Sequence, residues 1–512
     1  WLKSSKISSD QARQLLRALS MVPSVRLICA AGVLPWLVTS QIYGCYSYNA
    51  SVMMECDCSV SEAKCMGTWQ AGCTTCAYSN PHPMLRMYLP ASNIVEHSQM
   101  VFDVGDITTA VGDEDMTAVS TIYSSGRYSC KGTTSARTLK GFVEQATVDE
   151  KLKGEAFYDS FTNGDGPDAA LGVIPGTGRL ELPDAFWDTH MEAAVAGTGV
   201  FDGVSLAMRK VFIKKAVLGV LTMYTTHELE SAISKANDGN IDDASGAPHA
   251  WDEGWAFYYG MYPTAGKYSA WEFAWKRDTD FAYDGAGAMV SGATVASGEI
   301  RYHFTHGLMA SRAGDVSAMI AARNNIYRLL ALASIRAALK YAYQAQYGNM
   351  GNYSEDYHME AWVYFLAGAG WIEQAASGTA STVLDLLDFS KTSAELDSDL
   401  YCAVQAALIP AYEPLGLDCT KVGTWKSLPG SVTCSNLPAC PETDQLPQGL
   451  TSYAFTTDTD MGGNVDCGYA LTQHGDGMMT TTVATGDNNI SFAAGVSAFS
   501  AMLSLLAAML RA

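Results

Sequence analysis

Positive charge is scarce in this sequence of 512 residues, which has 32 Lys and Arg against 53 Asp and Glu and a formal net charge of −21 at pH 7. Such an acidic surface repels phosphate backbones and attracts cations. Nucleic-acid binding is therefore not expected. Two interpretations of the acidity remain open: it keeps an exported protein soluble, or it concentrates cations near a binding site.

Several catalytic motifs are also missing. The sequence has no nucleophile elbow, no phosphate-binding glycine loop and no pairing of Cys and His that would support nucleophilic catalysis. His227 and Glu228 resemble the beginning of a zinc-protease helix, but Ser231 stands where the His-Glu-x-x-His motif needs its second ligand. We therefore do not expect an enzyme. A metal-dependent hydrolase would need a general base that the sequence does not identify.

Cysteine is absent from residues 131–401, and the 13 cysteines gather toward the two ends. Cys29 lies in an apolar run, which leaves 12, an even number suited to disulfides in an exported protein. Seven lie between Cys45 and Cys130, and five between Cys402 and Cys467. Because both groups are odd, complete pairing requires at least one disulfide between the two ends. Zinc binding by closely spaced N-terminal cysteines is the alternative.

The two ends also carry apolar runs typical of an exported protein. Residues 21–40 have the layout of a secretory signal peptide, so residues 1–20 are expected to precede the natural start. Residues 490–510 are almost free of charge and follow a polar spacer, as in the signal for a GPI lipid anchor. A spanning helix is the alternative, since about 20 apolar residues cross a bilayer. Both alternatives predict a secreted, cell-surface or periplasmic glycoprotein, with sequons at Asn49 and Asn352.

Hydrophobic periodicity predicts helices in the cysteine-free middle. Apolar residues recur at helical spacing over 209–235 and 323–346, where there is no proline, and a shorter helical stretch covers 139–148. Each long stretch is followed by a turn-rich loop and then by a segment rich in His, carboxylates and Trp. Two such hairpins can pack as an up-and-down bundle. Internal duplication explains the repeat, and chance is the alternative.

The predicted fold is therefore mainly α, an up-and-down helical bundle with an internal helix-hairpin duplication, flanked by disulfide-rich irregular segments. The expected divisions are an upstream extension, the signal peptide, a Cys-rich N-terminal segment, the helical domain, a Cys-rich C-terminal segment, and a spacer with the hydrophobic anchor signal. In that order they cover 1–20, 21–40, 41–135, 136–400, 401–470 and 471–512.

Residues 248–260 concentrate His, carboxylates and aromatic side chains. A helix that begins at Pro248, a favoured first-turn position, puts His249 and Glu253 on one face. An imidazole and a carboxylate at that spacing can bind one metal ion, and carboxylate-rich sites suit iron, manganese or calcium better than copper(I). The structural alternative is that Asp252 and Glu253 offset the positive end of the helix dipole.

An Asp-x-His-Met-Glu-Ala string occurs twice, beginning at Asp188 and at Asp356. In a helix its Asp and Glu share a face, whereas the His points about 160° away. Each segment is therefore expected to supply one carboxylate pair or one His. The candidate metal ligands are His249, Asp252, Glu253, Asp356, His358, Glu360, Asp188, His190 and Glu192.

Three motifs together resemble a known family: His-x-Trp-Asp-Glu-x-Trp-Ala-Phe-Tyr at 249–258, Glu-Ala-Trp-x-Tyr at 360–364, and Arg-Thr-Leu at 137–139. They resemble the algal low-iron-inducible periplasmic proteins, also called iron-assimilating proteins, over roughly residues 85–400. The first motif also resembles imelysin-related bacterial surface proteins, which are likewise helical and linked to iron uptake.

The resemblance implies binding or delivery of iron, as Fe²⁺ or Fe³⁺, outside the cytoplasm and without catalysis. The implied partners are a membrane iron transporter or an oxidase or reductase, and the membrane itself through a lipid anchor or C-terminal helix. The competing hypothesis is a structural or adhesive cell-surface glycoprotein, in which the His, Glu and Trp segments only pack helices together.

Overall fold

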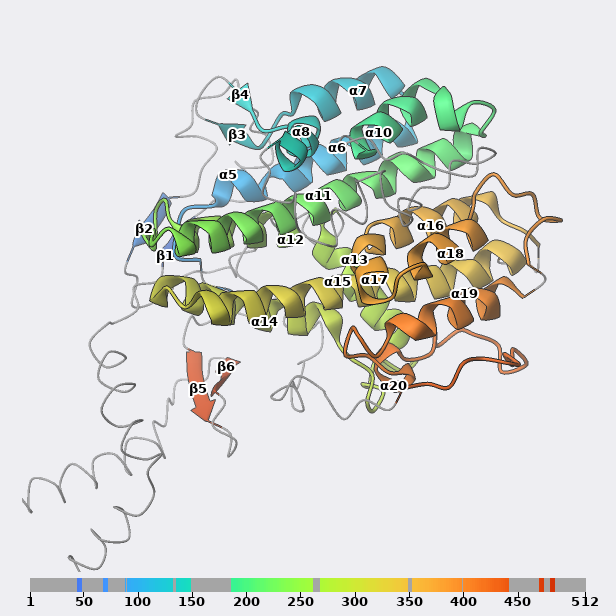
Figure 1. Cartoon of the computed structure of the whole chain (residues 1–512). Coiled ribbons are helices and arrows are strands. Elements are labelled where there is room, and N and C mark those ends of the chain that lie inside the picture. The colour runs from blue at the N-terminus through green and yellow to red at the C-terminus, as the bar shows by residue number, and fades with distance from the viewer. Residues whose placement is uncertain are drawn as a thin grey trace, which may run out of the picture.

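The computed structural model describes residues 88, 90–131, 135–148, 186–260, 268–348, 352–397 and 399–441 (Figure 1). It also gives the backbone of two short antiparallel sheets, β1 (Gly44–Ser47) with β2 (Thr68–Ala71) and β5 (Tyr469–Gln473) with β6 (Met479–Val483). The predicted signal peptide, the anchor signal and the sequon at Asn49 lie outside the described residues.

The N-terminal helices form a layer on one side of the longest helix of this half, α11 (Leu206–Asn237) (Figure 1). The helices of the layer are α5 (Val95–Ser98), α6 (Met100–Gly112), α7 (Met116–Ser125), α8 (Leu139–Val148) and α10 (Phe186–Ala196), followed by the 3₁₀ turn η1 (Gly199–Phe201). Between α7 and α8 the chain forms the two-residue strands β3 (Cys130–Lys131) and β4 (Ser135–Ala136), which pair antiparallel.

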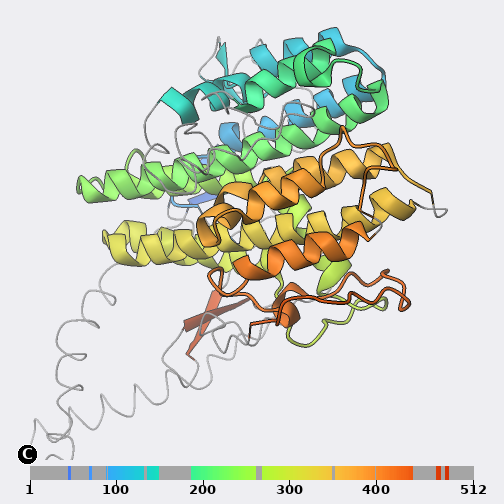
Figure 2. The same cartoon turned by 45° about the vertical axis from the view of Figure 1, so that its right-hand side comes forward.

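Two long helices of 32 residues each, α11 and α15 (Val316–Tyr347), organise the rest of the body. A helix of this length spans about 48 Å. The shorter helices α12 (Ala247–Tyr259) and α16 (Glu355–Leu366) pack against α11 and α15, so the two predicted hairpins are present. In the sequence, α13 (Ala270–Phe281) and α14 (Ala296–Ala313) lie between α12 and α15. Figure 2 shows α11, α15 and α16 running side by side.

The C-terminal helices cover the outer side of α15. They are α17 (Ala369–Ala375), α18 (Thr379–Leu386), α19 (Leu400–Leu408) with the 3₁₀ turn η2 (Ile409–Ala411), and α20 (Cys419–Val422). Disulfides Cys402–Cys434 and Cys419–Cys440 tie down the irregular chain after α19. Cys130 is also disulfide-bonded, but its partner lies outside the described residues, so a disulfide joining the two ends stays a prediction.

Local sequence explains where the long helices begin. Ser205 caps α11, its hydroxyl oxygen accepting from the backbone N–H of Met208, and Asp315 caps α15 in the same way through Ala318. Such side-chain caps satisfy backbone donors that the first turn of a helix leaves without a partner. In α12 the predicted first-turn proline, Pro248, is one residue inside the helix. The prediction of a mainly helical fold is confirmed.

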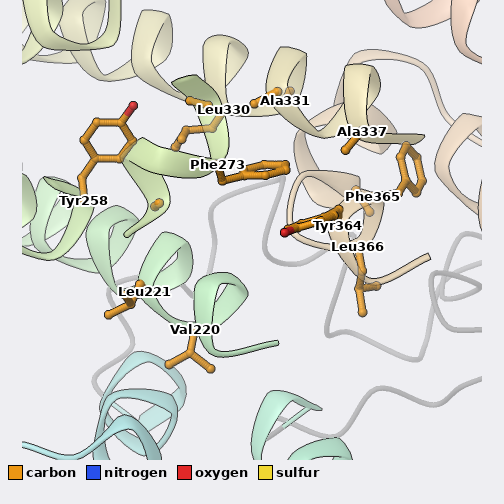
Figure 3. Packing of buried hydrophobic residues seen from close by; sticks show 14 of the residues in the cluster. Val220, Leu221, Tyr258, Phe273, Leu330, Ala331, Ala337, Tyr364, Phe365 and Leu366 are labelled. Carbon is orange, nitrogen blue, oxygen red and sulfur yellow. The ribbon is translucent and has the colours of Figure 1, made fainter. Parts of the chain in front are cut away.

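One hydrophobic core runs through the whole helical body, from Tyr88 to Trp425. Figure 3 shows buried side chains that α11, α12, α13, α15 and α16 contribute to it, among them Val220, Tyr258 and Phe365. Helices α5 to α7 and α19 belong to this same core. The predicted boundaries place α5 to α7 in the Cys-rich N-terminal segment and fall at the first residue of α19, and this division of the chain stays a prediction. Among the described residues, no helix is both long enough and apolar enough to cross a bilayer.

Candidate metal cluster on α12

The nine predicted ligands fall on three helices: α12, α16 and α10. Within the described ranges, the α12 pair is the one that meets a further imidazole. His249 and Glu253 lie one turn apart, with Nε2 of His249 3.2 Å from Oε1 of Glu253. The same carboxylate oxygen lies 2.8 Å from Nε2 of His97, which α5 supplies. We call His97, His249 and Glu253 the two-histidine cluster.

The two imidazoles approach Glu253 from different directions. The planes of His97 and His249 stand at 83° to each other, with ring centroids 6.1 Å apart. The side chains retain some solvent access: 21% for His249, 15% for Glu253 and 9% for His97. A small ion can therefore reach the cluster from outside, although much of its surroundings is protein.

Asp252 holds the cluster in place from behind. It is fully buried, its Oδ1 accepts from the hydroxyl of Tyr88 at 2.6 Å, and its Oδ2 accepts from the backbone N–H of Ser92 at 2.8 Å. The Ser92 hydroxyl lies 2.8 Å from the same Oδ2 and 2.8 Å from Nδ1 of His249. Asp252 thus ties the chain before α5 to α12 and fixes the orientation of His249, the role that outer hydrogen bonds play for metal-binding imidazoles. Asp252 was also predicted as a ligand; its oxygens are occupied by Tyr88 and Ser92 here, and metal binding by Asp252 stays a prediction.

Ser92 links Asp252 to His249. Burial raises the pKa of Asp252 to about 7, against the hydrogen bonds of Tyr88 and Ser92. When Asp252 is ionised, it accepts the hydroxyl proton of Ser92, and the Ser92 oxygen can then accept from Nδ1–H of His249. Nε2 of His249 is the nitrogen that faces Glu253.

Glu253 is the negative centre of the cluster. Burial alone would raise its pKa, but the charge of His97 and hydrogen bonds from His249 and His97 hold the pKa well below its usual range. Burial lowers the pKa of His97 in spite of the opposing attraction of Glu253, and the positive charge of Arg137 lowers it further. Arg137 also forms an ion pair with Glu96, Nη1 to Oε2, at 3.6 Å. The Arg-Thr-Leu motif at 137–139 therefore begins beside the cluster.

The predicted ligands on α16 have other partners. Oε1 of Glu360 lies 3.0 Å from Nζ of Lys215 on α11, and Asp356 is exposed. His358 is buried with Nδ1 3.0 Å from the hydroxyl of Tyr353, and burial lowers its pKa to about 4. The structure brings none of these three residues to the two-histidine cluster.

The predicted ligands on α10 share a lysine instead of an ion. Nζ of Lys140 lies 3.4 Å from Oδ2 of Asp188 and 2.6 Å from Oε1 of Glu192. His190 is buried, its Nδ1 lies 3.0 Å from the carbonyl oxygen of Phe186, and burial lowers its pKa to about 4. The expectation that the carboxylates share a face while the histidine points elsewhere agrees with this arrangement. Metal binding by these three residues stays a prediction.

The described part of the chain contains no group of three or more His, Cys, Asp or Glu side chains arranged to hold a metal ion. In the two-histidine cluster both imidazoles meet one oxygen of Glu253. Donor atoms that share an ion at bond lengths of about 2.1 Å lie about 3.0–3.4 Å apart. The two observed separations between an imidazole nitrogen and the Glu253 oxygen, 2.8 and 3.2 Å, are close to this spacing.

Comparison with known proteins agrees with the iron-related resemblance. The family model described as low iron-inducible periplasmic protein matches residues 68–437, a span that contains every helix named above. No curated protein and no solved structure matches the sequence. The description connects the family with low iron and with the periplasm, and the resemblance to imelysin-related proteins stays a prediction. This chain belongs to the low iron-inducible periplasmic protein family.

Proposed function

We propose that the protein binds iron outside the cytoplasm and holds it for uptake by the cell, with His97, His249 and Glu253 as its protein ligands. The observation that carries this proposal is the meeting of two imidazoles at one ionised, partly accessible carboxylate. His249 and Glu253 were predicted from their helical spacing, and α5 adds the third donor.

The donor set favours iron among the common metals. Two imidazoles and one carboxylate are the set with which proteins bind non-haem Fe²⁺, and three protein ligands leave coordination positions for water or another small molecule. A structural zinc site would close the shell with four protein ligands, and calcium prefers oxygen ligands alone. An incomplete shell also suits an ion that is cargo, because the remaining positions allow it to leave.

The rest of the proposed role follows from the family and the sequence. An acidic exterior concentrates cations around the protein. Delivery would be to a membrane transporter, or to an oxidase or reductase that changes the oxidation state of iron, and a lipid anchor or C-terminal helix would hold the protein at the membrane. No step of catalysis by this chain is proposed.

The competing function is a structural or adhesive surface protein. A specific observation favours it: the three cluster side chains satisfy one another without an ion, and Asp188, Glu192 and Glu360 are neutralised by lysines. On this hypothesis Glu253 serves only to join α5 to α12.

Titration of the exported protein separates the two hypotheses. Binding of Fe²⁺ under nitrogen, and of Fe³⁺, Mn²⁺, Zn²⁺ and Ca²⁺, is measured calorimetrically for the wild type and for Glu253→Gln. The matched control is Glu360→Gln, at the corresponding position of the second hairpin, where the partner is Lys215. We expect iron to bind in preference to the other ions, with affinity reduced about tenfold or more in Glu253→Gln, since a charged ligand is lost, and unchanged in Glu360→Gln.

Equal, weak binding of every cation, unaltered in Glu253→Gln, would support the structural hypothesis. Thermal unfolding of each variant without metal shows whether a loss of binding reflects a loss of fold. A third variant, His97→Ala, tests the residue that sequence patterns do not reveal.

A further inference from the structure

A small cavity lies away from the two-histidine cluster, where α6, α11, α13, α15 and α16 meet. Its volume is about 130 Å³, and its wall contains Lys214 and Lys215 of α11 and Lys276 and Arg277 of α13. Four cationic side chains around one small cavity are unusual for this chain, in which basic residues are far outnumbered by acidic ones.

The positive charge of this cavity is only partly neutralised. Lys215 pairs with Glu360 at 3.0 Å and Lys276 with Glu272 at 2.5 Å. Lys214 has no ion pair among the described residues. Burial lowers its pKa, the neighbouring charges of Lys210 and Lys215 lower it further, and the charge of Asp356 opposes them. An anion in the cavity would relieve the repulsion between Lys214 and Lys215.

Arg277 adds two buried donors without a geometric hydrogen bond in the described part of the chain. Its side chain is 3% exposed, and its Nη2 lies 2.9 Å from Oδ2 of Asp280. That carboxylate is shared, because Nζ of Lys340 lies 2.9 Å from the same oxygen. Nε and Nη1 of Arg277 are buried without a hydrogen-bond partner among the described residues, and, against the effect of burial, the neighbouring Tyr341 raises the pKa of the guanidinium. A buried donor without a hydrogen bond is costly, so these two N–H groups favour an acceptor in the cavity.

Aromatic rings fix the guanidinium and form the other walls. The guanidinium carbon of Arg277 lies 5.2 Å from the ring centroid of Tyr341, 5.8 Å from that of Phe273 and 5.9 Å from that of Tyr364. Phe273 and Tyr364 stack with centroids 4.6 Å apart, and Figure 3 shows them facing each other from different helices. Arginine held against aromatic faces is pre-organised to present its remaining N–H groups to a planar or tetrahedral oxyanion.

The geometry points to a binding site for a small oxyanion, with Arg277 and Lys214 as its main cationic contacts and Lys215 and Lys276 around it. The cavity admits an ion of a few heavy atoms, such as inorganic phosphate, sulfate or a short carboxylate, and is too small for a nucleotide. The shared chemistry of these ligands is a compact group of acceptor oxygens carrying negative charge.

This site is separate from the two-histidine cluster. Lys215 precedes Tyr224 by nine residues on α11, which corresponds to about 14 Å along the helix axis, and Tyr224 packs on Phe257 beside His97. The inference therefore does not rest on iron binding. In a variant that loses oxyanion binding, iron binding can be measured as a control, and the reverse also holds.

The test is calorimetric titration of the full, metal-free protein with sodium phosphate, sodium sulfate, sodium malonate and sodium chloride. The variants are Lys214→Gln and Lys276→Gln, both on accessible side chains, so that neither removes a buried group. The control is Lys235→Gln, which deletes the same charge near the far end of α11. Glu253→Gln serves as the control for the iron site.

We expect saturable binding of at least one oxyanion, about tenfold weaker in Lys214→Gln because a charge-assisted contact is lost. Binding should be weakened less in Lys276→Gln, whose charge Glu272 already neutralises, and unchanged in Lys235→Gln and Glu253→Gln. Binding of phosphate and sulfate but not malonate would identify a tetrahedral ligand. Binding of malonate but not phosphate or sulfate would identify a carboxylate. Absence of saturation with every oxyanion, binding of chloride equally well, or binding unaltered in Lys214→Gln would overturn the inference.

Discussion

The two long hairpins, α11 with α12 and α15 with α16, share an architecture but differ in chemistry. Their long helices are equal in length, and Glu253 on α12 corresponds to Glu360 on α16. Glu253 meets two imidazoles, whereas Glu360 meets the ammonium of Lys215. The same carboxylate on the same kind of helix thus belongs to a candidate iron site in one hairpin and to the border of a cationic cavity in the other.

The two glutamates have different partners because the residue one turn earlier differs and because a different helix faces each of them. His249 of the first hairpin is replaced by Asp356 in the second, and the facing residue is His97 of α5 in one case and Lys215 of α11 in the other. Local sequence therefore fixes which face of a helix carries the carboxylate. The chemistry of the site depends on which other helix packs against that face.

The hairpins also differ in how buried aspartates anchor them. In the first, Asp252 accepts hydrogen bonds from the neutral groups of Tyr88 and Ser92. In the second, Asp278 of α13 pairs with Arg336 of α15 at 2.8 Å, both side chains being fully buried. Arg336 also donates to the backbone oxygens of Val422, Thr294 and Lys421, and so links α15 to the disulfide-bonded C-terminal segment.

Breaking the charged anchor should have the largest effect. In Arg336→Met the carboxylate of Asp278 stays buried without its cation, and we expect the free energy of unfolding to fall by about 3–5 kcal/mol. Lys340→Met, one turn further along α15, removes a partly accessible cation. Its partner Asp280 still has the ion pair with Arg277, so the free energy of unfolding should fall by about 1 kcal/mol or less. Urea unfolding measures both. A loss in Arg336→Met no greater than in Lys340→Met would contradict the assignment of Arg336 as an anchor.

The pH dependence of stability should sharpen the contrast between the charged anchor around Arg336 and the neutral one around Asp252. Glu299 on α14 lies near Arg328 and Arg336, and burial raises its pKa from 4.5 to about 7. The native state therefore keeps this proton over a range in which the unfolded chain releases it. Its stabilising contribution is complete below about pH 4.5 and is lost as the pH rises through about 7, amounting to about 3 kcal/mol.

Glu299→Gln removes this titration without changing the size of the side chain. The difference in unfolding free energy between the variant and the wild type, measured by urea unfolding from pH 4 to pH 8, should shift in favour of the variant as the pH rises. A difference independent of pH would show that Glu299 ionises normally in the native protein.

Sequence patterns account for the hairpins well, because the evidence for them is local. The 209–235 and 323–346 periodicities continue without proline. Helix α11 extends two or three residues beyond its stretch at each end, and α15 begins seven residues before its stretch and ends one residue after it. The spacing of His249 and Glu253 likewise predicts their contact. No local pattern predicts the role of His97. It lies in a four-residue helix that is far from α12 in the chain and that carries no recognisable motif. The partners Lys215 and Lys140 could not be predicted either, because they depend on how separate helices pack.

The smallest expected effect concerns a glycine that distinguishes the hairpins. Gly254 of α12 corresponds to Ala361 of α16, and a Cβ at Gly254 would lie 3.4 Å or more from its neighbours, an ordinary contact distance. Since glycine weakens a helix interior relative to alanine, Gly254→Ala should stabilise the protein by roughly 0.5–1 kcal/mol without altering the adjacent cluster. The matched control is Gly307→Ala on α14, where a Cβ would come within 1.7 Å of the ring of Trp251 and should destabilise by about 1–3 kcal/mol. If Gly254→Ala destabilises as strongly as Gly307→Ala, then α12 packs more closely than α16 does, and the two hairpins are less alike than their shared pattern indicates.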